Sequence, residues 1–217
     1  MGAIPRVNAH AASASWRRVS RRTGRVIRFA TVKSDARWLR LRDVLRERSL
    51  KFGNFVLRSG KASSYFFDGK QTTLSAEGAA LVGPLMFELI KDLDVAAVGG
   101  PTLGADPIVT AVAAESFRAG KPLDAFIVRK ETKDHGIGDR IAGPWRAGQR
   151  VAILEDALTT GSAIKMAVEA AREAGMVVVA AATIVDRLEG GADNLRALGV
   201  ECRALYTIRD FGIEPPG

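Results

Sequence analysis

The stretch that most constrains this chain is VAILEDALTTGSA, residues 151–163, in which a short apolar run leads into two acids and a hydroxyl-rich turn. Val151 to Leu154 is apolar throughout, as in a parallel strand that is covered on both faces. After the turn, alanines and Met166 recur at helical spacing, and Gly175 stands where a left-handed helix end is expected. The stretch therefore predicts a strand, a turn and a helix in direct succession.

The turn at residues 159–162 predicts an anion-binding site. Its small residues allow several backbone N–H groups to face one point at the positive end of the helix, which suits a phosphate dianion. Glu155 and Asp156 would repel that phosphate, so they suit sugar hydroxyls or a magnesium ion. A ribose 5-phosphate carries both kinds of group. Strands that end in an acid are also common in α/β proteins, so this pattern alone leaves a purely structural role open.

The apolar run, the two acids and the Thr/Gly/Ser turn together resemble the phosphoribosyl-diphosphate motif of type I phosphoribosyltransferases. RKETKDHG, residues 129–136, resembles the catalytic loop of one branch of that family, the orotate phosphoribosyltransferases. LRSGKASSYFF, residues 57–67, is similar to the N-terminal hood of the same enzymes. Without this context, a solvated loop would explain the charges and a core position would explain the aromatic residues. The resemblance covers about residues 38–211.

The resemblance implies transfer of phosphoribosyl from 5-phospho-α-D-ribose 1-diphosphate (PRPP) to orotate, giving orotidine 5′-monophosphate and diphosphate in de novo pyrimidine synthesis. It also implies a homodimer with shared active sites, and Mg²⁺ held mainly by PRPP rather than by protein side chains. Two alternatives remain open. One is a regulator with the same fold that senses a nucleotide and binds nucleic acid through a basic tail. The other is a purine-type phosphoribosyltransferase.

The site residues that the resemblance implies come from the hood, the loop and the turn. For orotate, Arg187 is expected to meet the carboxylate, although pairing with Glu189 or Glu155 is the structural alternative. The other residues expected to bind orotate are Phe66, Phe67 and Thr159. The residues expected to bind PRPP are Arg58, Arg129, Lys130, Lys133, His135, Glu155, Asp156, Ala157, Leu158, Thr159, Thr160, Gly161, Ser162 and Ala163. Those expected to be catalytic are Lys130, Lys133, His135 and Asp156.

Two positions depart from the family pattern. Arg58 stands where the hood usually has a lysine, and it keeps the charge but not the tunable pKa of lysine. The glycine-rich turn GGPTLGADPI, residues 99–108, lacks a lysine that many members carry there. Diphosphate contacts from this turn are therefore in doubt.

Alternating strands and helices predict an α/β fold with a mostly parallel central sheet, which by resemblance is the type I phosphoribosyltransferase fold. Residues 35–217 are expected to form a single domain, with a hood at about 50–72 and a core at about 73–211. The hood is expected to be an antiparallel hairpin with a bulge or a long loop. The strands are expected at residues 94–99, 124–128, 151–154, 177–185 and 201–208. The helices are expected at 37–48, with Ser34 or Asp35 as cap, at 75–93, with Ser75 as cap, after the turn at 99–108 and on through 111–118, at 163–174 and at 192–198.

The charge of the chain is unevenly distributed. The net charge is +8, yet residues 1–34 carry eight basic and no acidic residues, while the rest holds 24 of each kind. This segment is expected to be disordered, as a dispensable tail or an early translation start, as an organellar transit peptide, or as a nucleic-acid arm. No apolar run reaches about 18 residues, so no transmembrane helix is expected. Cys202 is the only cysteine, which excludes an intramolecular disulfide and favours the cytoplasm.

Overall fold

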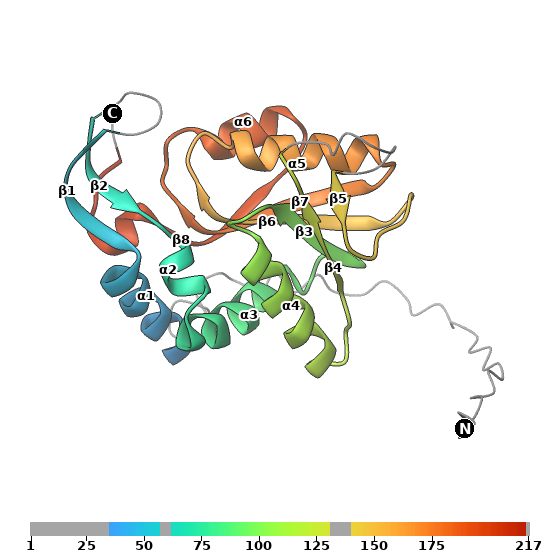
Figure 1. The fold of residues 1–217 in the computed structure, drawn as a ribbon, viewed down its shortest axis with the longest axis horizontal. Helices are drawn as coiled ribbons and strands as arrows, with labels where there is room; N and C mark the ends of the chain where they lie inside the picture. The colour runs from blue at the N-terminus through green and yellow to red at the C-terminus, as the bar shows by residue number, and fades with distance from the viewer. Residues whose placement is uncertain (1–34, 57–61, 131–139, 216–217) are drawn as a thin grey trace, which may run out of the picture.

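The computed structural model describes residues 35–56, 62–130 and 140–215, and these residues form a sheet between two layers of helices with a two-stranded hood at one end (Figure 1). The predicted extension at residues 1–34 lies outside the described part of the chain. None of the described helices is long and apolar enough to span a membrane.

The central sheet has six strands within the described residues, and five of them run parallel. Their carboxyl ends therefore lie at one end of the sheet, while β5 pairs antiparallel with β4 at one edge. This confirms the predicted, mostly parallel sheet. In sheet order the strands are β5 (Ile141–Ala142), β4 (Asp124–Val128), β3 (Ala97–Pro101), β6 (Arg150–Leu158), β7 (Val177–Asp186) and β8 (Cys202–Thr207).

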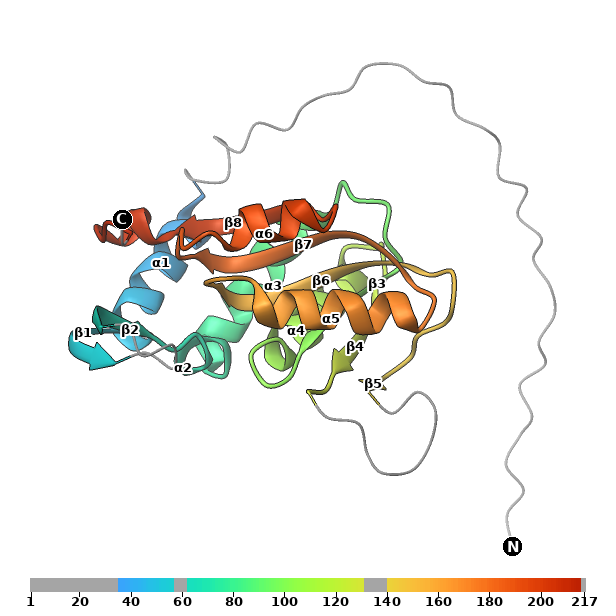
Figure 2. The same ribbon diagram turned by 90° about the horizontal axis from the view of Figure 1, so that it is seen from above.

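The apolar start of β6 is buried on both faces, as its sequence predicted. Ala152 and Leu154 belong to the core on one face, and Val151 and Ile153 belong to the core on the other. Helices cover both faces, with α5 and α6 on one side and α1, α3 and α4 on the other (Figure 2). Their bounds are α1 (Ala36–Arg48), α3 (Ala76–Ile90), α4 (Asp106–Arg118), α5 (Ser162–Glu173) and α6 (Gly191–Ala197).

The helix starts follow the predicted caps. Asp35 accepts a hydrogen bond from the backbone N–H of Arg37, 2.8 Å away, at the start of α1. Ser75 accepts one from the N–H of Gly78, 3.1 Å away, at the start of α3. Such caps satisfy N–H groups that have no partner within the helix. At the far end of α5, Gly175 adopts the predicted left-handed conformation, with φ of 80°.

Several element bounds differ from the predictions. α3 ends at Ile90 rather than at residue 93, and α4 begins at Asp106, inside the predicted strand-to-helix turn at residues 99–108. β6 continues past Leu154 through both acids, because its pairing with β7 extends to Leu158. Three short elements were not predicted: β5, α2 (Lys70–Thr73) and the 3₁₀ helix η2 (Ile208–Phe211).

The hood consists of β1 (Leu50–Val56) and β2 (Ala62–Phe67), which pair antiparallel with a bulge between Phe52 and Phe55. This confirms the predicted antiparallel strand pair, and the bulge, one of the two alternatives left open by the sequence, is present. Side chains alternate along β2, so Tyr65 and Phe67 are buried while Phe66 is 42% exposed. The buried side of the hood packs into the same core as α1 and α3.

An aromatic pair joins α1 to the last strand of the sheet. The rings of Trp38 and Tyr206 have centroids 4.6 Å apart. Trp38 Nε1 donates a hydrogen bond to the carbonyl of Leu205 at 3.0 Å, and the Tyr206 hydroxyl donates one to the carbonyl of Trp38 at 2.7 Å. Both side chains are buried, so the pair contributes packing as well as hydrogen bonds.

Trp38→Ala should destabilise the protein by about 3–5 kcal/mol, because it leaves a cavity and removes the donor to Leu205. Leu39→Ala is the matched control, since the Leu39 side chain is 41% exposed on the same helix. Equilibrium unfolding in urea measures both. Equal losses for the two variants would show that α1 does not depend on the buried pair.

Candidate active site

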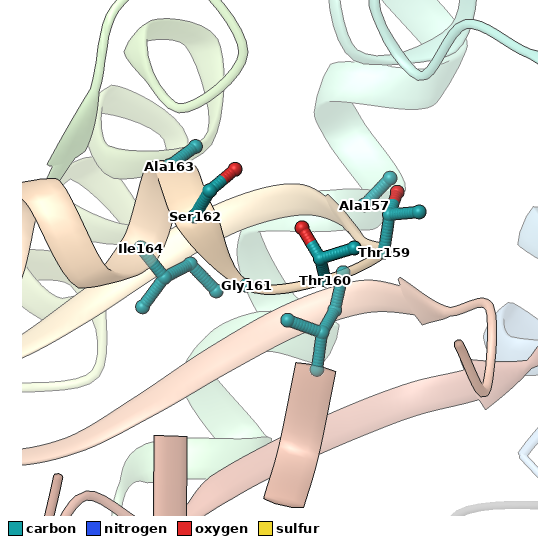
Figure 3. Close-up of a pocket in the computed structure, with 8 residues that line it drawn as sticks. Ala157, Thr159, Thr160, Gly161, Ser162, Ala163 and Ile164 are labelled. Atoms are coloured by element: carbon teal, nitrogen blue, oxygen red, sulfur yellow. The ribbon is translucent and has the colours of Figure 1, made fainter. Parts of the chain in front are cut away.

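The turn after β6 forms a small pocket at the carboxyl end of the sheet. Its volume is about 70 Å³, and residues 157–164 line it (Figure 3). Gly161, with φ of 82°, is the N-cap residue just before α5, and no side chain caps this end of the helix. The first N–H groups of α5 are therefore available to a ligand, and the helix dipole favours an anion there.

α6 holds this turn in place. The side-chain amide of Asn194 donates a hydrogen bond to the carbonyl of Thr160 at 2.9 Å. At the start of α6, Gly191 lies so close that a Cβ there would come within 2.5 Å of the Thr159 carbonyl oxygen. The shape of the turn thus depends on contacts with α6 as well as on its own residues.

Glu155 and Asp156 stand at the end of β6 next to this pocket. Glu155 is only 6% exposed, and its Oε1 accepts a hydrogen bond from the backbone N–H of Asp156 at 3.1 Å. Burial, and then the neighbouring charge of Asp156, raise the pKa of the Glu155 carboxyl well above 4.5. The pair therefore has one carboxyl that takes up a proton more readily than an exposed glutamate does.

Two glycine backbones close over this acid pair. A Cβ on Gly104, in the turn after β3, would lie 2.3 Å from Glu155 Oε1. A Cβ on Gly69, just before α2, would lie 2.5 Å from Asp156 Oδ2. Any other residue at these positions would collide with the carboxylates. The turn at residues 99–108 and the end of the hood thus meet at the acid pair.

Arg187 lies at the end of β7, beside the hood. Its backbone N–H donates a hydrogen bond to the carbonyl of Leu158 at 2.9 Å, which joins the ends of β7 and β6. Its Nε donates one to the hydroxyl of Tyr65 at 3.0 Å, and the guanidinium lies over the Tyr65 ring at 4.7 Å. Its Nη2 lies 2.9 Å from Glu189 Oε1. The pairing with Glu189 that the sequence left open is thus present.

No protein-family model matches the chain. The orotate phosphoribosyltransferase of Sorangium cellulosum is 50% identical over 185 residues, which cover 82% of this chain and 95% of that protein. This chain belongs to the orotate phosphoribosyltransferase family. A crystal structure of the Mycobacterium tuberculosis orotate phosphoribosyltransferase in complex with Fe(III) dicitrate matches with a TM-score of 0.74 and 40% identity, covering 82% of this chain and 99% of that one. A crystal structure of the same enzyme in complex with PRPP matches with a TM-score of 0.70 and 38% identity, covering 82% and 99%.

Within this family member, the predicted PRPP residues of the turn lie together. Residues 157–163 line the pocket, and Glu155 and Asp156 precede it on β6. Arg129 and Lys130 follow β4, which β3 separates from β6 in the sheet. The N–H of Arg129 donates a hydrogen bond to the carbonyl of Arg140 at 2.7 Å. Three other predicted residues lie outside the described part of the chain: Arg58, Lys133 and His135.

The two aromatic residues predicted for orotate do not face the same way. Phe67 is buried in the core, whereas Phe66 points to the other side of β2, where its ring lies 5.8 Å from that of Phe55. The reason is the alternation of side chains along a strand. Tyr65, which was not assigned to a ligand, shares the side of Phe67 and contacts Arg187.

The sequence interpretation also missed the run DGK, residues 68–70, whose central residue, Gly69, packs against Asp156. An Asp-Gly pair directly after a strand indicates a turn, but nothing local indicates what the turn contacts. In the described residues, no three His, Cys, Asp or Glu side chains are grouped so that they could hold a metal ion.

Glu155→Gln should make the protein more stable at neutral and alkaline pH. Because burial raises the pKa of Glu155, the protonated carboxyl favours the folded state, and this contribution is lost as the pH rises from the unfolded value near 4.5 through the folded one. Glutamine stays neutral, so its advantage in melting temperature should widen as the pH rises above about 4.5. Thermal unfolding across that range measures it.

Glu47→Gln serves as the control, because Glu47 is exposed on α1. A difference between wild type and Glu155→Gln that stays constant with pH would contradict the burial argument.

Proposed function

We propose that this chain transfers phosphoribosyl from PRPP to orotate, releasing diphosphate and forming orotidine 5′-monophosphate for pyrimidine synthesis. The observation that carries the proposal is the uncapped α5 terminus directly beside the buried Glu155 and the half-buried Asp156. This arrangement offers donors to a phosphate and acceptors to sugar hydroxyls within one turn. Membership of the orotate phosphoribosyltransferase family supports the proposal.

In this proposal the chain's residues bind and orient PRPP. The N–H groups of residues 159–163 hold the 5-phosphate, and Glu155 and Asp156 accept hydrogen bonds from the ribose hydroxyls. As the C1–O bond breaks, positive charge grows on the ribose, and nearby carboxylate charge stabilises it. The raised pKa of Glu155 limits repulsion between the two acids while the site is empty.

Negative charge grows on the leaving diphosphate at the same time. We assign Arg129, Lys130, Lys133 and His135 to that group by the family resemblance. Two adjacent carboxylates cannot complete the octahedral shell of Mg²⁺, so the ion would be held mainly by the phosphates of PRPP and by water rather than by protein side chains. Mg²⁺ bound in this way would neutralise part of the diphosphate charge.

Orotate differs from uracil by its carboxylate, which needs a cationic partner once water is excluded. Arg187 is that partner in our proposal, with Thr159 near the ring and N1 directed at ribose C1. Tyr65 and Glu189 already orient the guanidinium. A purine-type enzyme would have no carboxylate for Arg187 to bind, and a nucleic-acid-binding regulator would have to use residues 1–34. The absence of an intramolecular disulfide is compatible with the cytoplasm as the compartment.

Wild-type protein with PRPP and Mg²⁺ should therefore consume orotate but not uracil or hypoxanthine. Arg187→Ala should lower kcat/KM for orotate by about 10²-fold or more, which corresponds to about 2.7 kcal/mol, because two charge-assisted hydrogen bonds are lost. PRPP affinity, measured by calorimetry, should change little. Lysine at this position should restore activity only in part, since it lacks the forked geometry.

Arg196→Ala is the control for the loss of charge, because Arg196 is exposed on α6. Tyr65→Phe keeps the ring under the guanidinium and removes only the hydroxyl, so a milder loss on orotate is expected. Equal losses for orotate and PRPP in Arg187→Ala would assign the arginine to the fold or to the ribose site instead.

We further propose a homodimer in which Lys133 and His135 act in the neighbouring subunit's site, as the family resemblance implies. Lys133→Ala and Asp156→Asn should each be nearly inactive. When dimers of the two variants are dissociated, mixed and reassembled, hybrid dimers should regain activity. In a hybrid dimer one of the two sites carries both defects and the other site carries neither. Hybrids that form without recovering activity would contradict the shared site.

A further inference from the structure

The acid pair lies in a strongly negative environment for a site that would receive an anionic substrate. Glu155 and Asp156 occupy the end of β6, and Asp68 is close by in the chain that packs against them. The turn that closes over Glu155, residues 99–108, contains no basic residue. A diphosphate that approaches this pair therefore needs a cation from another element.

α2 supplies such a cation. Gly69 packs against the Asp156 carboxylate so closely that an added Cβ would lie 2.5 Å from Oδ2. Lys70 is the next residue, and neighbouring Cα atoms lie only about 3.8 Å apart. The flexible side chain of Lys70 therefore starts beside the acid pair and has the length to reach a ligand bound there.

The Lys70 ammonium is held at the edge of the site rather than buried in it. Its Nζ lies 2.6 Å from Asp68 Oδ1, and the side chain is 40% exposed. The hydrogen bond to Asp68 raises the pKa of Lys70, and the negative charges of Asp156 and Glu155 raise it further. Lys70 is therefore positively charged at neutral pH and within the field of both acids.

We propose that Lys70 binds the diphosphate group of PRPP at the acid pair, and that Asp68 holds the Lys70 ammonium at the edge of this site until substrate arrives. This inference rests on the proposed function of the site. On binding, the ammonium exchanges the Asp68 carboxylate for the diphosphate as its partner. Because Asp68 holds it beforehand, the ammonium is already partly desolvated and in position when the diphosphate enters. Lys70 would be a substrate-binding residue contributed by the hood side of the site.

A purely structural role for Lys70 makes a different prediction. An exposed ion pair such as Lys70–Asp68 contributes only about 0–1 kcal/mol to stability. Removing the charge should therefore leave the fold nearly unchanged. A large loss of PRPP affinity with an unchanged melting temperature would then be specific to ligand binding.

The test uses the full-length protein with Lys70→Gln, Lys70→Arg and Asp68→Asn. Lys121→Gln is the control, because Lys121 is exposed and precedes β4, at the opposite end of the sheet. PRPP is titrated by calorimetry with Mg²⁺ and without orotate, and inorganic diphosphate serves as a second probe. Steady-state kinetics then separate KM for PRPP from KM for orotate and from kcat.

Lys70→Gln should raise the Kd for PRPP and for diphosphate about tenfold or more, with KM for orotate and the melting temperature little changed. Lys70→Arg should recover part of the affinity, since it keeps the charge. Asp68→Asn should bind PRPP at least as tightly as wild type, because it removes the competing anion. Lys121→Gln should behave as wild type.

Unchanged PRPP affinity in Lys70→Gln overturns this inference while leaving the proposed function intact. The inference is also overturned if Lys70→Gln loses PRPP affinity and stability together and Lys70→Arg does not restore the affinity. Failure of the wild type to bind PRPP would overturn both proposals together.

Discussion

The burial of Glu155 beside Asp156 is the interaction on which the arrangement at the end of β6 depends. A buried carboxyl next to a second carboxylate is costly to ionise, since burial and like charge both disfavour the anion. The backbone N–H of Asp156 offsets part of that cost, while two glycines approach the carboxylates closely. Main chain therefore encloses the two carboxylates on the sides of Gly69 and Gly104. The carboxylates stay in place as acceptors for sugar hydroxyls, and no side chain of these two residues fills the space beside them.

The same enclosure connects the hood to the sheet. Gly69 contacts Asp156, and Tyr65 contacts Arg187, so residues on either side of the end of β2 meet the ends of β6 and β7. The proposed ribose site and the proposed orotate site therefore share one structural support. A change in how the hood packs should affect both ligands, even where the altered residue touches neither.

Much of the fold follows from local patterns. The strand before the acids, the caps Asp35 and Ser75 and the hood bulge are each specified by neighbouring residues, so the sequence predicts them well. The ends of a strand were harder to predict where they depend on pairing with another strand that is distant in the sequence. β6 extends through its two acids because β7 continues beside it, and β5 exists only because β4 provides an edge.

By itself, the sequence determined the strand, turn and helix that form the phosphate pocket, because residues adjacent in the chain make that geometry. It also determined the acid pair and the family to which the chain is similar. Only the tertiary structure decided which side of the hood faces Arg187, that Glu189 pairs with it, and that Gly69, the residue before Lys70, packs against Asp156. Tyr65 and Arg187 are 122 residues apart, so their contact depends on how the hood packs over the ends of the strands and not on any local pattern.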